Sequence, residues 1–312
     1  MDAFARAVAA QFGLAEVVSV HRPAQGGADV RVLTTKAGSF VLKRFQHAWQ
    51  AELFDTVQRH LNARGVRQAR LLRAPDGSLV THDGYSLQER LPGTVVMSPS
   101  ARQCQVVFRY LARYDVALED LCVPPQLDAD DTIWARTASA EDLVADLPQL
   151  LERHLAAVDR TPVTHALAIL AEALPAVRSL PPQLVHGDVG PDNVLIDGSE
   201  AAVIDFTPYH EPVMFSLSAA LYWYFIYARP DGADLAGIGS SLQNYAQLRP
   251  WRAAELSVLP AMVLRESLRR LAVPLALADA GGERPGRATA ARYEAVATAA
   301  VAVPGLVAVS RW

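Results

Sequence analysis

Residues 184–206, LVHGDVGPDNVLIDGSEAAVIDF, constrain the fold of this 312-residue chain more than any other stretch. Short apolar runs rich in β-branched side chains alternate with polar loops, and Asp197-Gly198 is a typical hairpin turn. The pattern predicts three strands, the last over residues 201–206. Polar residues stand where these strands end, and strand ends are positions from which a rigid scaffold presents chemistry.

Three polar side chains in this stretch, Asp188, Asn193 and Asp205, are candidates for one site. Asp205 lies in an apolar segment, where a carboxylate is costly unless it is paired or binds a metal. A carboxylate and the amide of Asn193 are oxygen ligands that suit Mg²⁺, which also binds substrate phosphates. Asp188 would then orient an attacking hydroxyl and accept its proton. The structural alternative is a buried His186, a glycine turn and an aspartate cap.

The residues His186-Gly187-Asp188, with Asn193 five positions after the aspartate, and Ile204-Asp205-Phe206 resemble two segments of the aminoglycoside phosphotransferase family. That family includes homoserine kinase-like and choline kinase-like enzymes. The resemblance implies an α+β fold, protein-kinase-like and two-lobed, with a small antiparallel β-sheet N-lobe and a mainly helical C-lobe. It also implies Asp188 as catalytic base, Asn193 and Asp205 as Mg²⁺ ligands, and ATP as donor.

Two positions depart from the family pattern. Thr207 stands where the family commonly has a glycine after the metal-binding segment, and the metal carboxylate itself is retained. Ser216 stands where the family often has an aspartate. A serine can still cap a helix, but the missing carboxylate leaves the rigidity of this region open.

The expected N-lobe is residues 1–92, a nucleotide-binding sheet with one helix, and residues 93–312 are the expected helical C-lobe with the catalytic loop and acceptor site. Strands are predicted over residues 17–20, 29–35 and 39–45. Gly26 and Gly27 lie in a loop between strands, where glycines let backbone N–H groups approach a phosphate. A plain turn is the commoner role of such a pair.

Lys43 alternates onto the same strand face as apolar neighbours, which is unusual unless its ammonium has a partner. It resembles the nucleotide-binding lysine on the third strand of kinase-like folds. The alternative places Arg44 inward and Lys43 at the sheet edge. A helix follows over residues 47–64, and in kinase-like proteins its glutamate, here Glu52, pairs with that lysine.

Asp55, which also lies in the first half of this helix, is the alternative to Glu52 as the partner of Lys43. A solvated carboxylate in a first helical turn is nearly as good an explanation for either residue. Further along, residues 85–91 resemble the last N-lobe strand and the hinge. In the family the adenine contacts hinge backbone atoms, which here implies Glu89 and Leu91.

The C-terminal part is predicted to be helical. Arg265 and Arg269 lie four residues apart and share one helix face, from which paired hydrogen bonds can grip a carboxylate or phosphate. This helix resembles the arginine-bearing helix of homoserine kinase-like members. The alternative, a solvated face with local ion pairs, has equal weight. His210 and Glu211, polar residues just past Asp205, are further candidate substrate contacts, although an exposed loop histidine is the commoner case.

Composition narrows the remaining choices. Hydrophobic residues make up 51% of the chain, and the net charge of −4 gives no argument for binding nucleic acid. The uncharged run over residues 213–228 is shorter than the roughly 20 residues of a membrane span, which favours a buried core helix. Two cysteines without metal spacing fit a reducing compartment. We therefore expect a cytoplasmic protein with no membrane or nucleic-acid partner and an oligomeric state that the sequence leaves open.

The expected reaction moves the γ-phosphoryl group of ATP to a hydroxyl of a small molecule. The arginine-rich C-terminal third favours an amino-acid-like or amino-alcohol acceptor, as in homoserine kinases. An aminoglycoside-type antibiotic is the second candidate. A nucleotide-binding pseudokinase with a regulatory role is a third, of a different class. No Ala-Pro-Glu signature follows Asp205, which argues against a protein substrate.

Overall fold

The computed structural model describes residues 3–14, 16–23, 30–128, 137, 139–155, 158–227, 229, 231–282 and 285–309. The chain folds into two compact units, Met1–Val96 with Val194–Phe206, and Met97–Asn193 with Thr207–Trp312. The expected boundary was a single one after residue 92. The first unit instead also takes in a later hairpin, because strand β7 (Val194–Asp197) pairs with β5 (Thr94–Val95).

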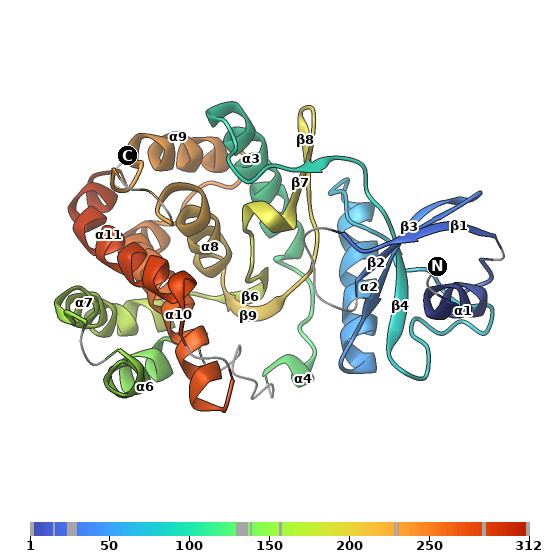
Figure 1. Ribbon diagram of the computed structural model, residues 1–312. Coiled ribbons are helices and arrows are strands. Elements are labelled where there is room, and N and C mark those ends of the chain that lie inside the picture. Colours follow the sequence, from blue (N-terminus) through green and yellow to red (C-terminus); the bar gives the residue numbers. More distant parts are fainter. Residues whose placement is uncertain are drawn as a thin grey trace. The chain divides into compact units, whose positions relative to one another are not determined.

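The first unit contains a four-stranded antiparallel sheet with the order β1-β2-β3-β4 (Figure 1). Its strands are β1 (Val17–His21), β2 (Arg31–Thr35), β3 (Gly38–Arg44) and β4 (Tyr85–Glu89). The three strands predicted before residue 46 are thereby confirmed in existence and order. Gly26 and Gly27, the candidate phosphate-contacting glycines, lie outside the described residues.

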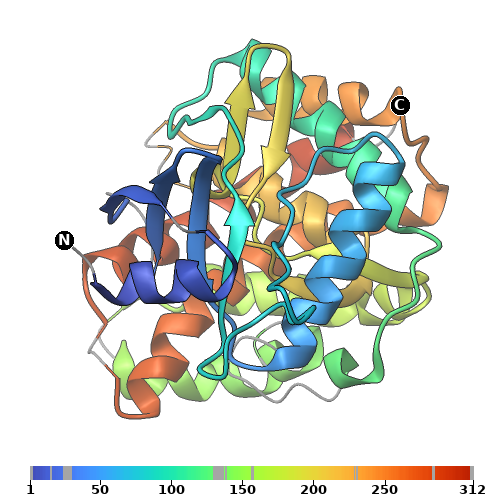
Figure 2. The ribbon, with the colours of Figure 1, turned by 90° about the vertical axis from the view of Figure 1, so that its right-hand side faces the viewer.

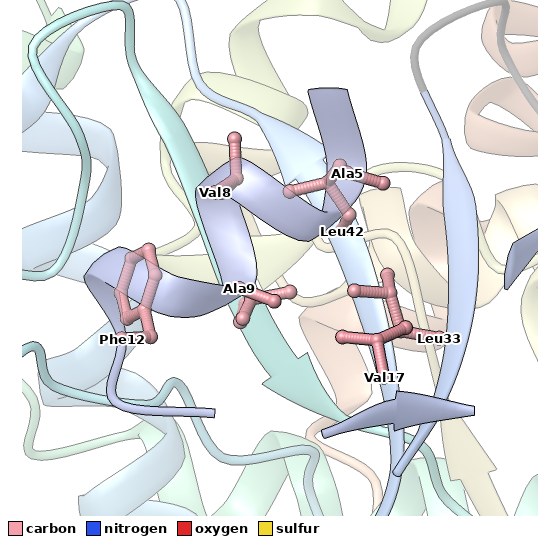
Figure 3. Packing of buried hydrophobic residues seen from close by; sticks show 8 residues of the cluster. Ala5, Val8, Ala9, Phe12, Val17, Leu33 and Leu42 are labelled. Atoms are coloured by element: carbon pink, nitrogen blue, oxygen red, sulfur yellow. The ribbon is translucent and has the colours of Figure 1, made fainter. Parts of the chain in front are cut away.

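Helix α1 (Ala3–Gln11) covers one face of this sheet. Its apolar residues Ala5, Val8 and Ala9 recur at helical spacing and pack against Leu33 and Leu42 (Figure 3). Both leucines are fully buried. Full burial of such a side chain contributes about 1.5–3 kcal/mol, so this small cluster holds the strand that carries Lys43.

Helix α2 (Ala48–Ala63) is the long light-blue helix in Figure 2. It packs in the same unit through a second apolar cluster. Phe54 of α2 lies between Phe45, at the end of β3, and Phe206, with ring centres 6.2 and 6.0 Å away. The helix predicted over residues 47–64 is therefore confirmed. Because Phe206 follows Asp205, this aromatic row also anchors the segment that bears Asp205.

The hairpin of the first unit is β7 and β8 (Glu200–Val203), with β5 as the third strand of its sheet. The prediction that the last strand reaches residue 206 was wrong. Strand β8 ends at Val203, and Asp205 has a left-handed backbone with φ of 57°. Among the described residues, every other positive φ belongs to a glycine. An extended strand cannot pass through that conformation.

The second unit is mainly helical. Its helices are α3 (Ala101–Leu118), α4 (Pro125–Asp128), α6 (Ala140–His154), α7 (Thr161–Arg178), α8 (Met214–Phe225), α9 (Leu235–Ala246), α10 (Ala253–Asp279) and α11 (Arg287–Val309). Figure 1 shows α10 beside α8 and α11, which are among its packing partners. The uncharged run expected to be a core helix is α8, almost all of which is buried.

Two features of this unit were not predicted. Strand β6 (Pro182–His186) pairs with β9 (Pro208–Pro212), a strand in the region expected to be a loop. Helix α10 also runs through Pro260 and Pro274, although a proline inside a helix usually kinks or ends it. By length and composition alone, α11 could cross a membrane. That is weak evidence, because a helix of a protein core can pass the same test.

Candidate active site

Lys43 lies on β3 opposite Ser86 of β4, whose hydroxyl donates to the Lys43 carbonyl at 3.2 Å. The Lys43 ammonium donates a hydrogen bond to the Asp205 carboxylate within the same unit. Burial lowers the pKa of Lys43 to about 8. Lys43, expected to bind the nucleotide, and Asp205, expected to bind the metal, are thus in contact. The ammonium of Lys43 has the partner that the strand pattern required. The alternative with Arg44 inward was wrong, since Arg44 is exposed.

The expected ion pair between Lys43 and Glu52 does not form. Glu52 is exposed on α2, and no ion pair of Glu52 occurs in the described part of the chain. Its rival Asp55 is buried, but it accepts hydrogen bonds from Arg59 at 3.1 Å and Arg73 at 2.5 Å. The ion-pair partner of Lys43 is therefore Asp205, and not a carboxylate of α2 as sequence reasoning had expected.

The two expected hinge residues, Glu89 and Leu91, differ in whether the backbone N–H is already hydrogen-bonded. The Glu89 N–H already donates to the Arg70 carbonyl at 2.8 Å. Leu91 is buried against Ala69 and Ala202, and its N–H has no hydrogen bond to any residue that the structure describes. Of the two N–H groups, that of Leu91 is the one left to donate to an adenine.

In the second unit, Gly187 follows β6 and is held on both sides. Its N–H donates to the Thr207 carbonyl at 2.8 Å, and its own carbonyl accepts from Arg269 at 3.0 Å. A Cβ at this position would lie 2.1 Å from two ring atoms of Tyr209. Glycine is needed here because the ring of Tyr209 lies directly against the backbone, and this contact fixes the loop on which Asp188 stands.

Both oxygens of the Asp188 carboxylate have protein partners. Arg270 Nη2 donates to Oδ1 at 2.6 Å, and Asn193 Nδ2 donates to Oδ2 at 3.0 Å. Burial alone would raise the pKa of Asp188, but the positive charges of Arg270 and Arg269, with His186, outweigh it and lower the pKa. The side chain remains 32% exposed. Asp188 is therefore an oriented, ionised carboxylate that a small molecule can reach.

Arg270 belongs to a charge network that is buried, and sequence reasoning foresaw only local ion pairs of Glu266 and Arg270, as an alternative on a solvated face. The Glu266 carboxylate, with no exposed surface, accepts from Arg269 at 2.8 and 3.0 Å and from Arg270 at 2.6 Å. Burial alone would raise the pKa of Glu266, but the two arginines lower it. The signal in the sequence was the helical spacing of Glu266 to Arg269 and Arg270, and a solvated face with local pairs was one of the two alternatives of equal weight.

The candidate substrate arginines are occupied. Arg265 donates to both oxygens of Glu211 at 2.7 and 3.1 Å, and Arg269 is bound to Glu266 and Gly187. Glu211 is therefore the ion-pair partner of Arg265 within the protein. His210 lies in β9 opposite Leu184, in a strand and not in the exposed loop that was expected.

The two expected metal ligands stand in different units, Asp205 in the first and Asn193 in the second. Because the Asn193 Nδ2 is committed to Asp188, its Oδ1 is left without a hydrogen-bond partner among the described residues. Within the same described residues, no group of three or more His, Cys, Asp or Glu could hold a metal ion. Mg²⁺ usually takes few protein ligands, together with oxygens from water and phosphate, and each of these two side chains by itself offers the kind of oxygen that Mg²⁺ binds.

The sequence model of the phosphotransferase enzyme family, APH, matches residues 20–251. The chain belongs to the aminoglycoside phosphotransferase (APH) family. Among curated relatives, a homoserine kinase from Rhizobium etli is 30% identical over 227 residues, 69% of this chain and 66% of that protein. A homoserine kinase from Azorhizobium caulinodans is 29% identical over 280 residues, 84% of this chain and 81% of that protein.

Solved structures of the family share the fold. An aminoglycoside phosphotransferase from Alicyclobacillus acidocaldarius has a TM-score of 0.63 at 17% identity, over 99% of this chain and 95% of its own. The choline kinase LicA from Streptococcus pneumoniae has a TM-score of 0.59 at 12% identity, over 95% and 98%. The fold is thus protein-kinase-like, as expected. The protein is a small-molecule kinase with a hydroxyl group as acceptor.

The structure describes both positions that depart from the family pattern. Thr207 accepts the Gly187 N–H through its backbone carbonyl, which a glycine would also supply. Ser216 is fully buried, and its hydroxyl has no hydrogen-bond partner among the described residues. Ser216 thus does not replace the carboxylate that the family often has at this position, and the Gly187 carbonyl is held by Arg269 and Arg270.

Proposed function

We propose that this kinase transfers the γ-phosphoryl group of ATP to the hydroxyl of a small amino-acid-like acceptor, in the manner of a homoserine kinase. The observation that carries the proposal is the Asp188 carboxylate, ionised and oriented by Arg270 and Asn193 while 32% of its side chain stays exposed. Such a group can accept a hydrogen bond from an alcohol and take its proton as phosphoryl transfer proceeds.

The donor side of the reaction rests on Lys43. Its ammonium can neutralise nucleotide phosphates, in exchange for Asp205. We propose Mg²⁺ as the cation, with Asn193 and Asp205 as its protein ligands. When bound, Mg²⁺ would neutralise phosphate charge. The amicoumacin kinase hAmiN, with a TM-score of 0.64 at 17% identity over 89% of this chain and 86% of its own, was solved with AMP-PNP and Ca²⁺.

The choice of acceptor is supported by the curated relatives named homoserine kinase and not by the arginines first considered. Arg265 and Arg269 already bind Glu211 and Glu266, so neither is available to a substrate carboxylate. Likeness to antibiotic kinases is at 17% identity or below and supports the fold alone. We retain a cytoplasmic location, without membrane or nucleic-acid partners, as a proposal based on composition.

The test is ATP consumption with a panel of alcohols: L-homoserine, choline, ethanolamine and an aminoglycoside. We expect L-homoserine to give the highest kcat/KM and Asp188→Ala to lower kcat by at least about a hundredfold while ATP still binds. The control is Asp197→Asn, which removes an exposed carboxylate in the hairpin turn of the same segment. Preferred turnover of the aminoglycoside would contradict an amino-acid-like acceptor. Full activity of Asp188→Ala would contradict Asp188 as the base.

A pseudokinase would behave differently in a second measurement. A catalytic kinase should show a rise in melting temperature with acceptor that depends on a bound non-hydrolysable ATP analogue. ATP binding without any turnover across the panel would favour the regulatory role.

A further inference from the structure

We propose that Arg270 is the positioning residue of the phosphoryl-transfer site, holding Asp188 in the orientation in which it meets the acceptor hydroxyl. The inference rests on the proposed function of Asp188. No family feature named above assigns this role to a residue of α10. The observation is a direct contact, since Arg270 Nη2 lies 2.6 Å from Asp188 Oδ1.

Arg270 is itself fixed in place from three directions. Its Nε donates to Glu266 at 2.6 Å, its Nη2 also reaches the Gly187 carbonyl at 3.3 Å, and its guanidinium lies 4.9 Å from the ring centre of Trp223. The side chain is 8% exposed. A planar guanidinium held by a carboxylate and an aromatic ring has little rotational freedom. The orientation of α10 is therefore transmitted directly to the Asp188 carboxylate.

Asn193 completes the arrangement from the other side. Its Nδ2 donates to Oδ2 of Asp188 and to the Asp188 backbone carbonyl, at 3.0 and 3.1 Å. With one oxygen held by Arg270 and the other by Asn193, the carboxylate plane is set by two fixed donors. Loss of either donor frees the plane to rotate, and a misplacement of about 1 Å at a reacting group can cost a hundredfold in rate.

Charge balance explains why the position needs an arginine. Two carboxylates, Asp188 and Glu266, meet two guanidinium groups, Arg269 and Arg270. A lysine at 270 would keep the charge but could not reach both carboxylates in the same fork geometry. We therefore expect Arg270→Lys to retain the fold while letting Asp188 move.

The test compares Arg270→Lys and Arg270→Met with Arg249→Lys. Arg249 is also a buried arginine, bound to both oxygens of Glu255 at 2.7 and 3.0 Å, but it does not contact Asp188. We expect Arg270→Met to lower kcat about a hundredfold, with KM for ATP within about twofold of wild type, and Arg270→Lys to recover part of the loss. Arg249→Lys should lower the melting temperature and keep kcat.

A second readout does not need turnover. The Asn193 side-chain amide protons donate to Asp188, so their hydrogen exchange reports whether the carboxylate stays in place. We expect faster exchange in Arg270→Met and Arg270→Lys than in wild type, with no change in Arg249→Lys. Unchanged kcat and unchanged exchange in the folded Arg270→Lys protein would overturn the proposal.

The outcome is separable from that of the proposed function. If wild type acts on a different alcohol, the homoserine proposal fails and the Arg270 comparison is made on that alcohol. If wild type turns over nothing, the exchange of the Asn193 amide still decides whether Arg270 positions Asp188.

Discussion

Arg265 donates two hydrogen bonds to Glu211, at 2.7 and 3.1 Å, and its guanidinium lies 4.6 Å from the ring centre of Phe215. The pair links α10 to β9, the strand that pairs with β6 immediately before the Asp188 loop. Two residues first considered as substrate contacts thus satisfy each other, and their function is to fix the helix against the strand.

The Arg265–Glu211 pair predicts strong energetic coupling. Arg265 is 2% exposed and Glu211 21%, so Glu211→Gln removes the carboxylate that binds this buried cation and should cost about 3 kcal/mol of unfolding free energy. Arg265→Met should cost a similar amount, and the double variant less than the sum of the two. Urea denaturation of all four proteins gives the coupling free energy. Additive losses would contradict a direct pair.

Replacement of Gly187 should disturb the loop through the Tyr209 ring. Gly187→Ala places a methyl group 2.1 Å from ring atoms, and overpacking of this kind costs about 1–3 kcal/mol. We expect a lower unfolding free energy together with a lower kcat, and partial recovery in Gly187→Ala/Tyr209→Leu. The matched control is Gly286→Ala, because a Cβ there meets no atom of the described residues within 4 Å. Equal stability of the two single variants would argue against the packing explanation.

Asp205 combines a carboxylate with a left-handed backbone, and the two can be separated by mutation. Asp205→Gly and Asp205→Ala both remove the carboxylate and should weaken Mg²⁺-dependent nucleotide binding to the same extent. Because φ is 57°, alanine should leave the protein about 1 kcal/mol less stable than glycine does. Calorimetric Mg²⁺ titration and chemical denaturation measure the two effects. A titration that neither substitution changes would remove Asp205 from the metal ligands.

Lys43 should give nucleotide binding a pH dependence. Since burial lowers its pKa to about 8, the ammonium is positive below that pH and loses its proton above it. Nucleotide affinity should therefore fall severalfold as the pH rises from about 7 to about 9.5. In the Lys43→Arg variant the guanidinium keeps its charge throughout this range, so the affinity should change much less. The measurement is the Kd of an ATP analogue at each pH, and parallel profiles would contradict the assignment to Lys43.

Local patterns in the sequence were enough for the secondary structure that carries the candidate site. Alternation placed Lys43 on a strand, and the Asp-Gly turn located the β7–β8 hairpin. These features depend on neighbours within a few residues. The same logic failed at residues 204–206, where β-branched composition favoured a strand but the backbone turns at Asp205.

Ion-pair partners could not be obtained in this way. Strand alternation showed that Lys43 needs a counter-charge, and sequence reasoning offered Glu52 or Asp55 of the next helix. The structure instead pairs Lys43 with Asp205, 162 positions away in the sequence. Arg270 and Asp188 are likewise 82 positions apart. Charges pair wherever folding brings them within reach, and spacing along one helix predicts only the neighbours three and four residues away.

The sequence by itself determined most of the strands and helices that carry the candidate site, because periodicity is a local property of the chain, and its motifs, through their resemblance to a known family, implied the kinase-like order of these elements and the residue types of the site. Only the tertiary structure decided which carboxylates and arginines neutralise one another. Burial makes an unpaired charge costly, so the packing of α10 against β9 and the Asp188 loop selects Arg265 for Glu211 and Arg270 for Asp188.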